Sequence, residues 1–433
     1  MMLSSLPPRR HVDPAKLFAL LERFSGFGAT PAGGVTRLCA SPEDGMARDL
    51  FRHVALAAGA CVRTDAVGNQ FAHFPLSGGI DAPLVMMGSH LDSQSRAGRF
   101  DGTLGVATAL CTGGELMARQ RAGVAYKADF VAVNWTNEEG ARYRPSLLGS
   151  SVYIGALTED FALTREDDKG IALGAALSAI GHRGVDEKPP LPACYLELHV
   201  EQESALEEAG KTIGVVGRNW GAIKIDVRFL GEQAHTGPTR MERRRDALLG
   251  AAYAIAGIRE VAARWPGLVH SSVARILVEP NAANVVPANV SIAAEIRAGD
   301  NALLREAGKV AEAVLAEAAS RANVTYEIAA RTERPVRSLP EAPAALLRQC
   351  ADAAGLASLD MDTVAGHDAI SLLGHCPIGL IFVPSIGGIT HNEAEDTAAP
   401  DIAAGLTLCT LAASRLCRAG GVPEAALLLP QEE

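Results

Sequence analysis

Alternation of strand-like and helical segments is the feature that most constrains how this chain can fold. Residues 13–27 and 42–60 carry apolar side chains at helical spacing, and strand-like runs then alternate with helical ones as far as residue 202. This alternation is typical of an α/β domain with a mostly parallel sheet. Because such domains bind ligands at the carboxyl ends of their strands, polar residues at those ends are the first candidates for function.

The middle of the chain has a different rhythm. A strand, a long helix over 241–265, two strands, a second helix over 301–322 and a last strand follow one another. This β-α-β-β-α-β order is that of a ferredoxin-like sandwich, a unit that can be inserted into another domain. We therefore expect an inserted domain over residues 215–332 and a discontinuous domain formed by residues 1–214 and 333–433.

Composition and charge exclude several classes of protein. The 433 residues are 48% hydrophobic and 21% charged, so the chain can bury a large core. Its net charge of -10 has the wrong sign for binding nucleic acid or anionic lipid. Residues 1–16 contain no apolar core of a signal sequence, and we expect no stretch that approaches the ~20 apolar residues of a membrane span. Eight cysteines without a CxxC pair indicate buried, reduced thiols, and hence a cytoplasmic protein.

Residues of the types that bind metal ions follow several of the predicted strands. They are His90 and Asp92 with Asp101, the Asn137-Glu138-Glu139 run, His199 and, near the C-terminus, His391. A single histidine beside a strand is more often a structural residue than a ligand. Imidazoles and carboxylates together, however, form the ligand set that Zn, Mn, Co or Ni prefers without any thiolate. Five such ligands suit two ions better than one.

The spacing of these residues suggests a division of roles. Two ions ~3.5–4 Å apart need a carboxylate that bridges them, and Asp101 in the turn GRFDGTLG is the candidate. Asp92 is placed to accept the second ring N–H of His90, although it also fits a plain turn at the strand end. If the segment is extended, Glu138 and Glu139 point to opposite sides, so only one readily reaches the ions and the other is free to transfer protons.

The motifs that carry these residues occur in the same order in a known family. They are GSHLDS, GRFDGTLGV, NEEGARY, LELHVEQ, AHTGPTRMERRRDAL, NVVPANV, AGHDA and FVPSIGGITHNEAE. From about Gly33 to Ala404 the chain thereby resembles the hydantoinase/carbamoylase branch of the M20 peptidase superfamily. This branch contains N-carbamoyl-L-amino-acid hydrolases, β-ureidopropionases and allantoate amidohydrolases.

The resemblance implies a role for each candidate ligand. His90 and His199 would bind one divalent ion, Glu139 and His391 a second, and Asp101 would bridge both. Carboxypeptidase-like relatives usually carry an acidic residue at the position of His199. The histidine here is a further point of resemblance to the carbamoylase branch. This argues against a simple peptidase.

The resemblance also assigns the catalytic groups. Glu138 would be the general base, taking a proton from the attacking water and passing it to the departing nitrogen. His235, in GEQAHTGPT, would donate to the oxyanion in the site of the neighbouring subunit. The other interpretation of His235 is a turn residue that caps the following helix. The inserted domain would be a lid and dimerisation domain, which implies a homodimer.

Substrate contacts follow from the same resemblance. Arg297 would bind the substrate carboxylate, for which a guanidinium offers a planar, bidentate fork. Asn284 would be its amide partner, Gln202 a further polar contact, and Gly388 would present backbone N–H groups. The run Arg243–Arg245 fits a solvated or dimer-facing surface better than a substrate site.

Three segments depart from the pattern that is usual in this branch. Residues 201–204 read EQES where EQGP is common, residues 95–98 read SRAG where Pro-x-Gly-Gly is usual, and residues 218–220 read RNW where smaller residues are common. Glu203 would favour a substrate with a cationic or amide-bearing group, but it equally fits a solvated loop acid. The substrate can therefore differ from the standard N-carbamoyl amino acids.

The sequence thus predicts an α/β protein with a dimetal M20-type catalytic domain and an inserted ferredoxin-like domain. We expect an amidohydrolase that cleaves the C–N bond of N-carbamoyl or related N-acyl amino acids, a small-molecule substrate class. The alternative in the same class is an allantoate-type ureidohydrolase or a deacylase of N-acyl or amide-conjugated amino acids. A non-catalytic binding protein would have lost Glu138 or a ligand, and a Rossmann dehydrogenase would carry G-x-G-x-x-G after its first strand.

Overall fold

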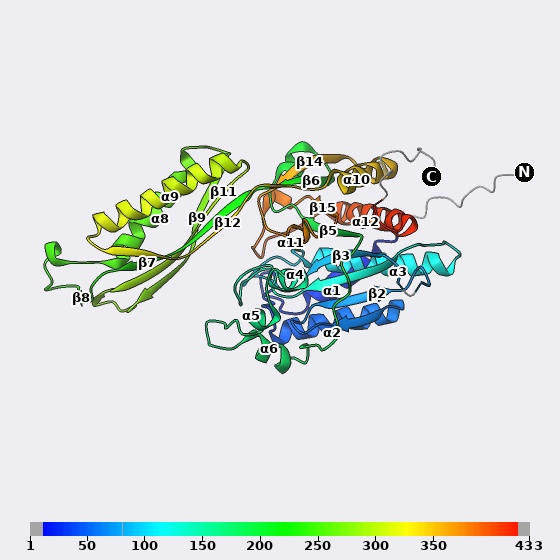
Figure 1. Ribbon diagram of the computed structural model, residues 1–433, viewed down its shortest axis with the longest axis horizontal. Coiled ribbons are helices and arrows are strands. Elements are labelled where there is room, and N and C mark those ends of the chain that lie inside the picture. The colour runs from blue at the N-terminus through cyan, green and yellow to red at the C-terminus, as the bar shows by residue number, and fades with distance from the viewer. Residues whose placement is uncertain (1–11, 80, 423–433) are drawn as a thin grey trace, which may run out of the picture. The chain divides into compact units, whose positions relative to one another are not determined.

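The structure is a computed structural model that describes residues 12–79 and 81–422, and these residues divide into two units (Figure 1). The main unit comprises the chain as far as Gly217, Leu339–Met361 and the chain from Gly366 onward, and the inserted unit comprises Arg218–Ser338 with Asp362–Ala365. The sequence predicted an insert over residues 215–332. Residues 1–11, on which the expected absence of a signal sequence depends, lie outside the described residues.

A nine-stranded sheet organises the main unit, in the order β1-β2-β4-β3-β5-β15-β6-β13, with β14 paired to β6. The chain enters the inserted unit through β6 and leaves it through β13. The strands are β1 (Cys61–Thr64), β2 (Gln70–Phe74), β3 (Leu84–His90), β4 (Asp129–Trp135), β5 (Cys194–Val200), β6 (Ile213–Asn219), β13 (Arg337–Ser338), β14 (Ser358–Thr363) and β15 (Ile378–Val383).

The sheet is parallel only at its centre. Strands β4, β3, β5 and β15 run parallel to one another, whereas β1, β2, β6 and β13 pair antiparallel with their neighbours. The expectation of a mostly parallel sheet was therefore right for the central strands and wrong for the edges. At one edge the reason is local, because β1 and β2 are joined by a turn too short for a parallel crossover. Every residue of the four central strands is buried, as in sheets covered on both faces.

Helices cover both faces of this sheet. One face packs against α1 (Ala15–Ser25), α2 (Pro42–Ala58), α3 (Thr103–Arg121), α10 (Glu341–Ala354) and α12 (Ala399–Ala419), and the other against α4 (Leu148–Tyr153) and α11 (Asp368–Leu372). The shorter helical segments are α5 (Glu159–Leu163), α6 (Leu173–Ala179), α7 (Ala205–Ala209) and η2 (Ile386–Gly388). Helix α2 begins as predicted, because the Ser41 side chain accepts a hydrogen bond from the Asp44 N–H.

Helix α12 contradicts one expectation from the sequence. It has 21 residues and is long and apolar enough, by length and composition alone, to cross a membrane. The prediction that no stretch approaches the length of a membrane span was therefore wrong for this segment. Because 67% of its most apolar window is buried and it packs against α3 and α10, it has the surroundings of a core helix.

The eight cysteines are free thiols. Five of them are buried and two are partly buried. Cys61, at the start of β1, is exposed, so the expectation that the thiols are buried was wrong at that position.

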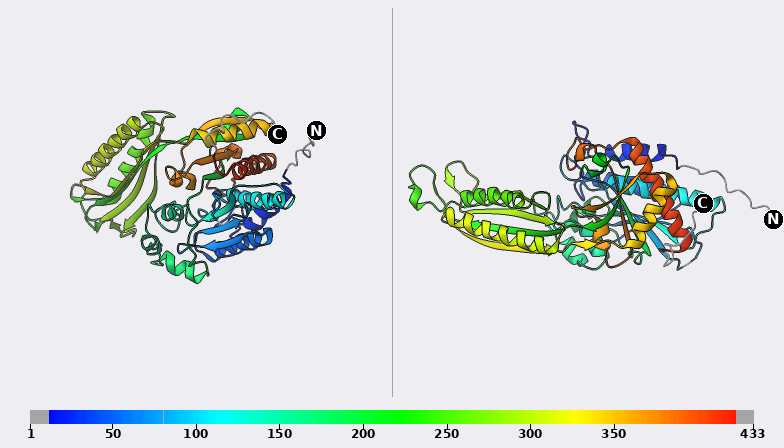
Figure 2. Two further views of the ribbon diagram at one scale, coloured as in Figure 1. Left: turned by 45° about the vertical axis from the view of Figure 1, so that its right-hand side comes forward. Right: turned by 90° about the horizontal axis from the view of Figure 1, so that it is seen from above.

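The inserted unit is a separate α/β sandwich. Its four antiparallel strands have the order β12-β7-β11-β9, and α8 and α9 lie side by side on one face of the sheet (Figures 1 and 2). Its elements are β7 (Gly221–Leu230), β8 (Ala234–His235), η1 (Met241–Arg243), α8 (Ala247–Ala263), β9 (Val269–Glu279), β10 (Val285–Val286), β11 (Asn289–Ala298), α9 (Asn301–Arg321) and β12 (Thr325–Arg334). The predicted β-α-β-β-α-β order is present.

One helix of this unit starts later than predicted. The helix expected from residue 241 begins at Ala247, because the Asp246 carboxylate caps it by accepting hydrogen bonds from Leu248 N–H and Leu249 N–H. Burial alternates along β11 from residue to residue, so one side chain in two enters the core beneath α8 and α9.

The segment Asp362–Ala365 belongs to this unit because specific side chains hold it there. Arg218 Nη2 lies 2.6 Å and Trp220 Nε1 3.1 Å from Asp362 Oδ2. Arg297 also donates to the carbonyl of Val364. Asn219 Nδ2 donates to the carbonyls of Thr363, at 3.3 Å, and Ala365, at 2.9 Å. All three members of the unusual RNW segment therefore hold the second stretch of chain that belongs to the inserted unit.

Candidate metal centre

Neighbouring strand ends of the main unit bring the candidate ligands together. His90 is the last residue of β3, His199 the last but one of β5, and Glu138 and Glu139 follow β4 directly after a two-residue turn. These strands are parallel neighbours in the order β4-β3-β5, so their carboxyl ends share one edge. His391 arrives on the loop after β15 and η2. The prediction that polar motifs gather at strand ends is confirmed for these strands.

Asp101 lies at the centre of the group, and its two carboxylate oxygens face different ligands. Oδ1 lies 3.0 Å from His199 Nε2 and 3.5 Å from His90 Nε2. Oδ2 lies 3.3 Å from His391 Nε2, which is itself 3.4 Å from Glu139 Oε2. Within each trio the ligand atoms lie within 4.8 Å of one another. One oxygen completes each trio, which is the arrangement that a carboxylate bridging two ions requires.

Main-chain carbonyls orient the two buried imidazoles. His90 Nδ1 lies 2.8 Å from the Asp92 carbonyl oxygen, and His199 Nδ1 lies 2.9 Å from that of Val200. A carbonyl oxygen only accepts, so each Nδ1 carries the proton and each Nε2 keeps its lone pair for a cation. The predicted contact from His90 to the Asp92 carboxylate is corrected here, because Asp92 Oδ1 lies 4.0 Å from the ring nitrogen.

The Asp92 carboxylate holds a different part of the site. Its oxygens accept hydrogen bonds from the backbone N–H groups of Glu138, at 3.2 Å, and Glu139, at 3.3 Å. The preceding Asn137 has a φ of 57°, so the segment turns sharply instead of remaining extended. For this reason both acids face the site, with Glu138 Oε2 3.6 Å from His90 Nε2 and Glu139 in the second trio.

The electrostatics of the group suit a cation. Burial raises the pKa of Glu138 well above its usual range and that of Glu139 to about 6. Burial also opposes ionisation of Asp101, but the neighbouring His199 holds the Asp101 pKa well below its usual range. The hydrogen bond to Asp101 raises the pKa of His391 to about 9. Buried carboxylates and imidazole lone pairs that face one space are the donor set of a divalent metal site, so these residues fit the expected ions.

A glycine allows two of the ligands to approach each other. Gly102 follows Asp101 and has a φ of 63°, and a Cβ at this position would lie 2.4 Å from the His90 ring. Any larger residue would therefore push His90 away from the Asp101 turn.

The sequence did not predict a role for Glu395. This buried carboxylate accepts hydrogen bonds through Oε1 from the N–H groups of Phe100 and Asp101, both at 3.1 Å. Burial raises its pKa to about 7. Glu395 therefore fixes the backbone that presents the bridging Asp101. The signal available was its position in the acidic THNEAED run, four residues after His391.

Two of the predicted substrate contacts lie in the main unit, and one of them, Gln202, contacts the centre directly. Gln202 Nε2 donates to Asp101 Oδ2 at 3.1 Å, and the Gln202 backbone has a φ of 67°. Gly388 has a φ of 65°, and a Cβ there would lie 3.0 Å from the Glu203 carbonyl carbon and 3.1 Å from Ser204 N. A glycine is therefore required where η2 approaches the 203–204 backbone.

The other three predicted contacts lie in the inserted unit. His235 is exposed on the β8/β10 ribbon, where it pairs with Val285, and the Asn284 carbonyl accepts from Thr236 N–H at 3.3 Å. His235 Nδ1 also accepts from Gly237 N–H at 3.0 Å, so it is a turn residue, but it does not cap the following helix α8, which Asp246 caps. His235 and Asn284 thus lie together on the ribbon.

Arg297 lies at the opposite end of the same sheet. Asn289, next to the ribbon, pairs with Leu230, whereas Arg297 pairs with Ala222. At ~3.3 Å per residue, these two positions of β11 are roughly 26 Å apart. Within one copy of the unit, Asn284 is therefore too far from Arg297 to act on the same group. The nearest carboxylate is that of Glu295, whose Oε1 accepts from Arg297 Nε at 2.8 Å.

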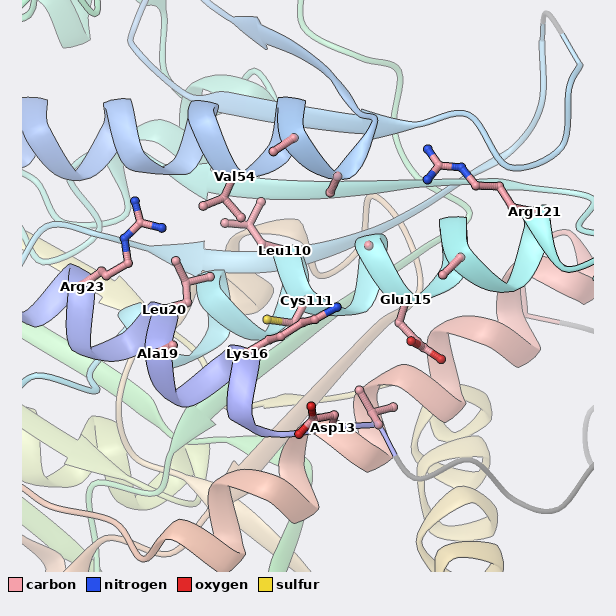
Figure 3. A pocket seen from close by; sticks show the side chains of 15 residues that line it. Asp13, Lys16, Ala19, Leu20, Arg23, Val54, Leu110, Cys111, Glu115 and Arg121 are labelled. Carbon is pink, nitrogen blue, oxygen red and sulfur yellow. The ribbon is translucent and has the colours of Figure 1, made fainter.

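A pocket of about 560 Å³ lies elsewhere in the main unit, between α1, α2 and α3. Figure 3 shows its side chains, with Leu20, Val54 and Leu110 on the apolar wall and the charged Lys16 and Glu115 close by. It is lined by none of the predicted site residues. The metal centre, and not this pocket, is therefore the candidate active site.

Comparison with known proteins agrees with this geometry. Residues 86–415 match the peptidase family M20/M25/M40. The chain is 34% identical over 398 residues to an N-carbamoyl-L-amino-acid amidohydrolase of Rhizobium meliloti, covering 92% of this chain and 94% of that protein. It is 31% identical over 398 residues to the allantoate amidohydrolase of Escherichia coli (strain K12), covering 90% and 95%. The crystal structure of a hydantoinase/carbamoylase family amidase from Burkholderia vietnamiensis superposes with a TM-score of 0.90 at 34% identity, covering 95% of this chain and 99% of that one.

Proposed function

This chain belongs to the peptidase family M20/M25/M40, and from this premise we propose that it is a two-metal amidohydrolase that cleaves the C–N bond of N-carbamoyl or related N-acyl amino acids. The observation that carries the proposal is the division of Asp101, whose two oxygens serve two separate ligand trios. Similarity to amidohydrolases over nine-tenths of the chain supports the same class of reaction.

The two trios would hold one divalent ion each. His90 and His199 would bind the first, Glu139 and His391 the second, and Asp101 would contact both. Nitrogen and oxygen donors without thiolate suit Zn, Mn, Co or Ni. When bound, such ions lower the pKa of a water between them and polarise the substrate carbonyl.

Glu138 would transfer the protons. Its carboxylate is buried beside the first trio, and burial raises its pKa toward the range in which a general base works at neutral pH. It would accept a proton from the attacking water and then donate it to the departing nitrogen. The hydrogen bond from its own N–H to Asp92 keeps its backbone in place during both transfers.

The inserted unit would supply substrate contacts from two copies of the chain. Arg297 would bind the substrate carboxylate with Asn284 as its amide partner, whereas His235 would donate to the oxyanion. Since these groups lie at opposite ends of one unit, a single amino-acid-sized substrate meets both only if two copies contribute. We therefore propose a homodimer with the inserted unit as lid, and Gln202 and Gly388 as the contacts from the main unit.

Two further assignments belong to this proposal. An allantoate-type ureidohydrolase remains the second candidate, because the identity to the allantoate amidohydrolase of Escherichia coli, 31%, is close to the 34% shared with the carbamoylase of Rhizobium meliloti. We also propose a cytoplasmic location, in keeping with the eight free thiols of the chain.

The test is product release from chelated protein after addition of Mn, Co, Ni or Zn. The substrates are N-carbamoyl, N-formyl, N-acetyl and N-succinyl amino acids and allantoate, with ammonia and free amine assayed separately. Metal-dependent amine release is expected, and ammonia formed with it identifies carbamoyl chemistry. Absence of release from every substrate, in protein that binds two ions, would contradict the proposed substrate class.

A further inference from the structure

Two buried arginines behind the metal centre take no part in the proposed reaction. Arg37 has 1% and Arg48 0% of its surface exposed. A guanidinium loses several kcal/mol of hydration when it is buried, so it persists only where other groups satisfy its charge and its five N–H donors. The partners of each arginine therefore show what it stabilises.

Arg37 binds backbone and hydroxyl oxygens from three segments. Nε donates to the Leu91 carbonyl at 2.5 Å, and Nη2 donates to the Thr103 hydroxyl at 2.7 Å. Nη1 donates to the carbonyls of Phe24, at 2.7 Å, and Phe27, at 3.0 Å, at the carboxyl end of α1. None of these partners is a carboxylate, so Arg37 here acts as a multivalent donor.

Two of the Arg37 partners are next to metal ligands in the chain. Leu91 directly follows His90, and Thr103 comes two residues after Asp101. A single planar group thus joins the end of β3 to the start of α3, with the carboxyl end of α1 as its support. The contact fixes the spacing between His90 and Asp101, whose ligand atoms lie 3.5 Å apart.

Arg48 plays the equivalent part for the segment that carries Glu138 and Glu139. Its Nε lies 2.8 Å from Asp44 Oδ2, and Nη1 donates to the Gly68 carbonyl at 2.6 Å. Nη2 donates to the Thr136 hydroxyl at 3.2 Å. Thr136 is the first of the two residues that join β4 to Glu138 and Glu139.

We propose that Arg37 and Arg48 are positioning residues, Arg37 for the trio that contains His90 and Arg48 for the trio that contains Glu139. Arg37 sets the backbone that presents His90 and Asp101, and Arg48 sets the turn that presents Glu138 and Glu139. This inference rests on the proposed function in one respect, namely that two ions bind. It assigns to neither arginine a contact with metal or substrate.

The proposal requires a guanidinium and not merely a positive charge. Lysine carries its three donors on one nitrogen, whereas Arg37 spreads its donors over segments that come from α1, β3 and α3. Arg37→Lys is therefore expected to behave like Arg37→Met in metal affinity.

The experiment is titration of chelated protein with Mn²⁺ by calorimetry, in the full chain. His90→Ala and His391→Ala identify which of two dissociation constants belongs to which trio. Because outer partners of ligands typically contribute 10–100-fold to metal affinity, Arg37→Met is expected to weaken binding at the His90 trio by about that factor, with the smaller loss at the Glu139 trio. Arg48→Met is expected to weaken binding mainly at the Glu139 trio.

Arg165→Met, which removes a guanidinium bound to the Phe161 carbonyl, is the matched control and is expected to leave both affinities unchanged.

Milder variants cover the case in which an arginine variant does not fold. Thr103→Val and Thr136→Val remove one acceptor each while retaining both guanidinium groups, and the same preference for one trio is expected on a smaller scale. Folded variants with wild-type affinity at both trios, or with equal losses at both, would overturn the inference. If the wild-type protein binds fewer than two ions, it is the proposed function that fails.

Discussion

The metal centre of the main unit and the ribbon of the inserted unit present their functional residues in opposite ways. At the metal centre, Asp101 is 3% exposed and lies within 3.5 Å of three histidine Nε2 atoms. On the ribbon, His235 is exposed and its ring accepts a hydrogen bond from the N–H of Gly237, two residues along the chain. The ligands of both trios all come from the main unit, whereas His235 would need another surface to act on, as the proposed homodimer supplies. Burial and satisfied hydrogen bonds would thus distinguish groups that a single unit organises from groups that the proposed assembly organises.

The largest effect is expected at the metal centre. Glu138→Gln keeps the shape of the side chain but removes the proton acceptor, and general acid–base groups contribute about 10²–10⁴-fold to rate. We expect kcat to fall by that factor while two ions still bind, as measured by turnover and by metal analysis of the same sample. Retention of turnover would contradict the general-base role.

Metal removal is expected to change hydrogen exchange at the metal centre but not on the ribbon. An ion present at ~1,000 times its dissociation constant stabilises the state that binds it by about 4 kcal/mol. Chelation should therefore increase hydrogen exchange at the ends of β3, β4 and β5 and leave the β8/β10 ribbon unchanged. An equal change in both regions would mean that the ribbon depends on the metal centre.

A smaller loss is expected from the ribbon. Removing one donor to an oxyanion costs about 10²–10³-fold in kcat, so His235→Ala should lower turnover by that factor without changing metal affinity. Mixed with Glu138→Gln protein, it should regain activity, because each hybrid dimer would combine one intact metal centre with one intact ribbon. If hybrids of the two variants stay inactive, His235 acts within its own copy or not at all.

Arg297 tests the other end of the inserted unit. Hydrogen bonds to charged groups contribute about 1.5–3 kcal/mol, so Arg297→Ala should raise KM about 10–100-fold for substrates with a free carboxylate. It should change kcat little and reduce discrimination against the corresponding amides. Unchanged discrimination would leave Arg297 only with its contacts to Glu295 and Val364.

The sequence predicted the ligands because their residue types are rare at the ends of apolar strands. His90 and His199 lie at the ends of such strands, the Glu138-Glu139 pair comes two residues after another, and parallel neighbours share an edge. The same reasoning predicted the order of elements in the insert. It did not predict the antiparallel edges of the main sheet, because strand pairing depends on contacts far along the chain.

Arg48 shows why the residues that support the site were missed. Together with Asp44 it forms an i,i+4 pair on a helix, the pattern of an exposed ion pair, yet both side chains are fully buried. Nothing in residue type or spacing separates the two cases. Likewise, the prediction that only one of the two glutamates readily reaches the ions held for an extended segment, whereas the positive φ of Asn137 turns the segment and brings both into the site.

The smallest effect concerns Glu203, where the sequence left two interpretations open. Glu203 is exposed, its carbonyl carbon lies beside Gly388, and it directly follows Gln202, whose side chain donates to Asp101. An exposed charge pair contributes about 0.2–1 kcal/mol and is screened by salt. If Glu203 selects cationic substrates, Glu203→Gln should lower kcat/KM for these substrates up to about fivefold and leave neutral ones unchanged.

Salt provides the internal control for that prediction. The difference between cationic and neutral substrates should shrink in the wild type as ionic strength rises, and should be absent from the variant at every salt concentration. Glu22→Gln, an exposed acid on α1, serves as the matched control. A Glu203→Gln variant with unaltered substrate preference would make Glu203 a solvated loop acid, and substrate selection would then rest with the buried centre and the inserted unit.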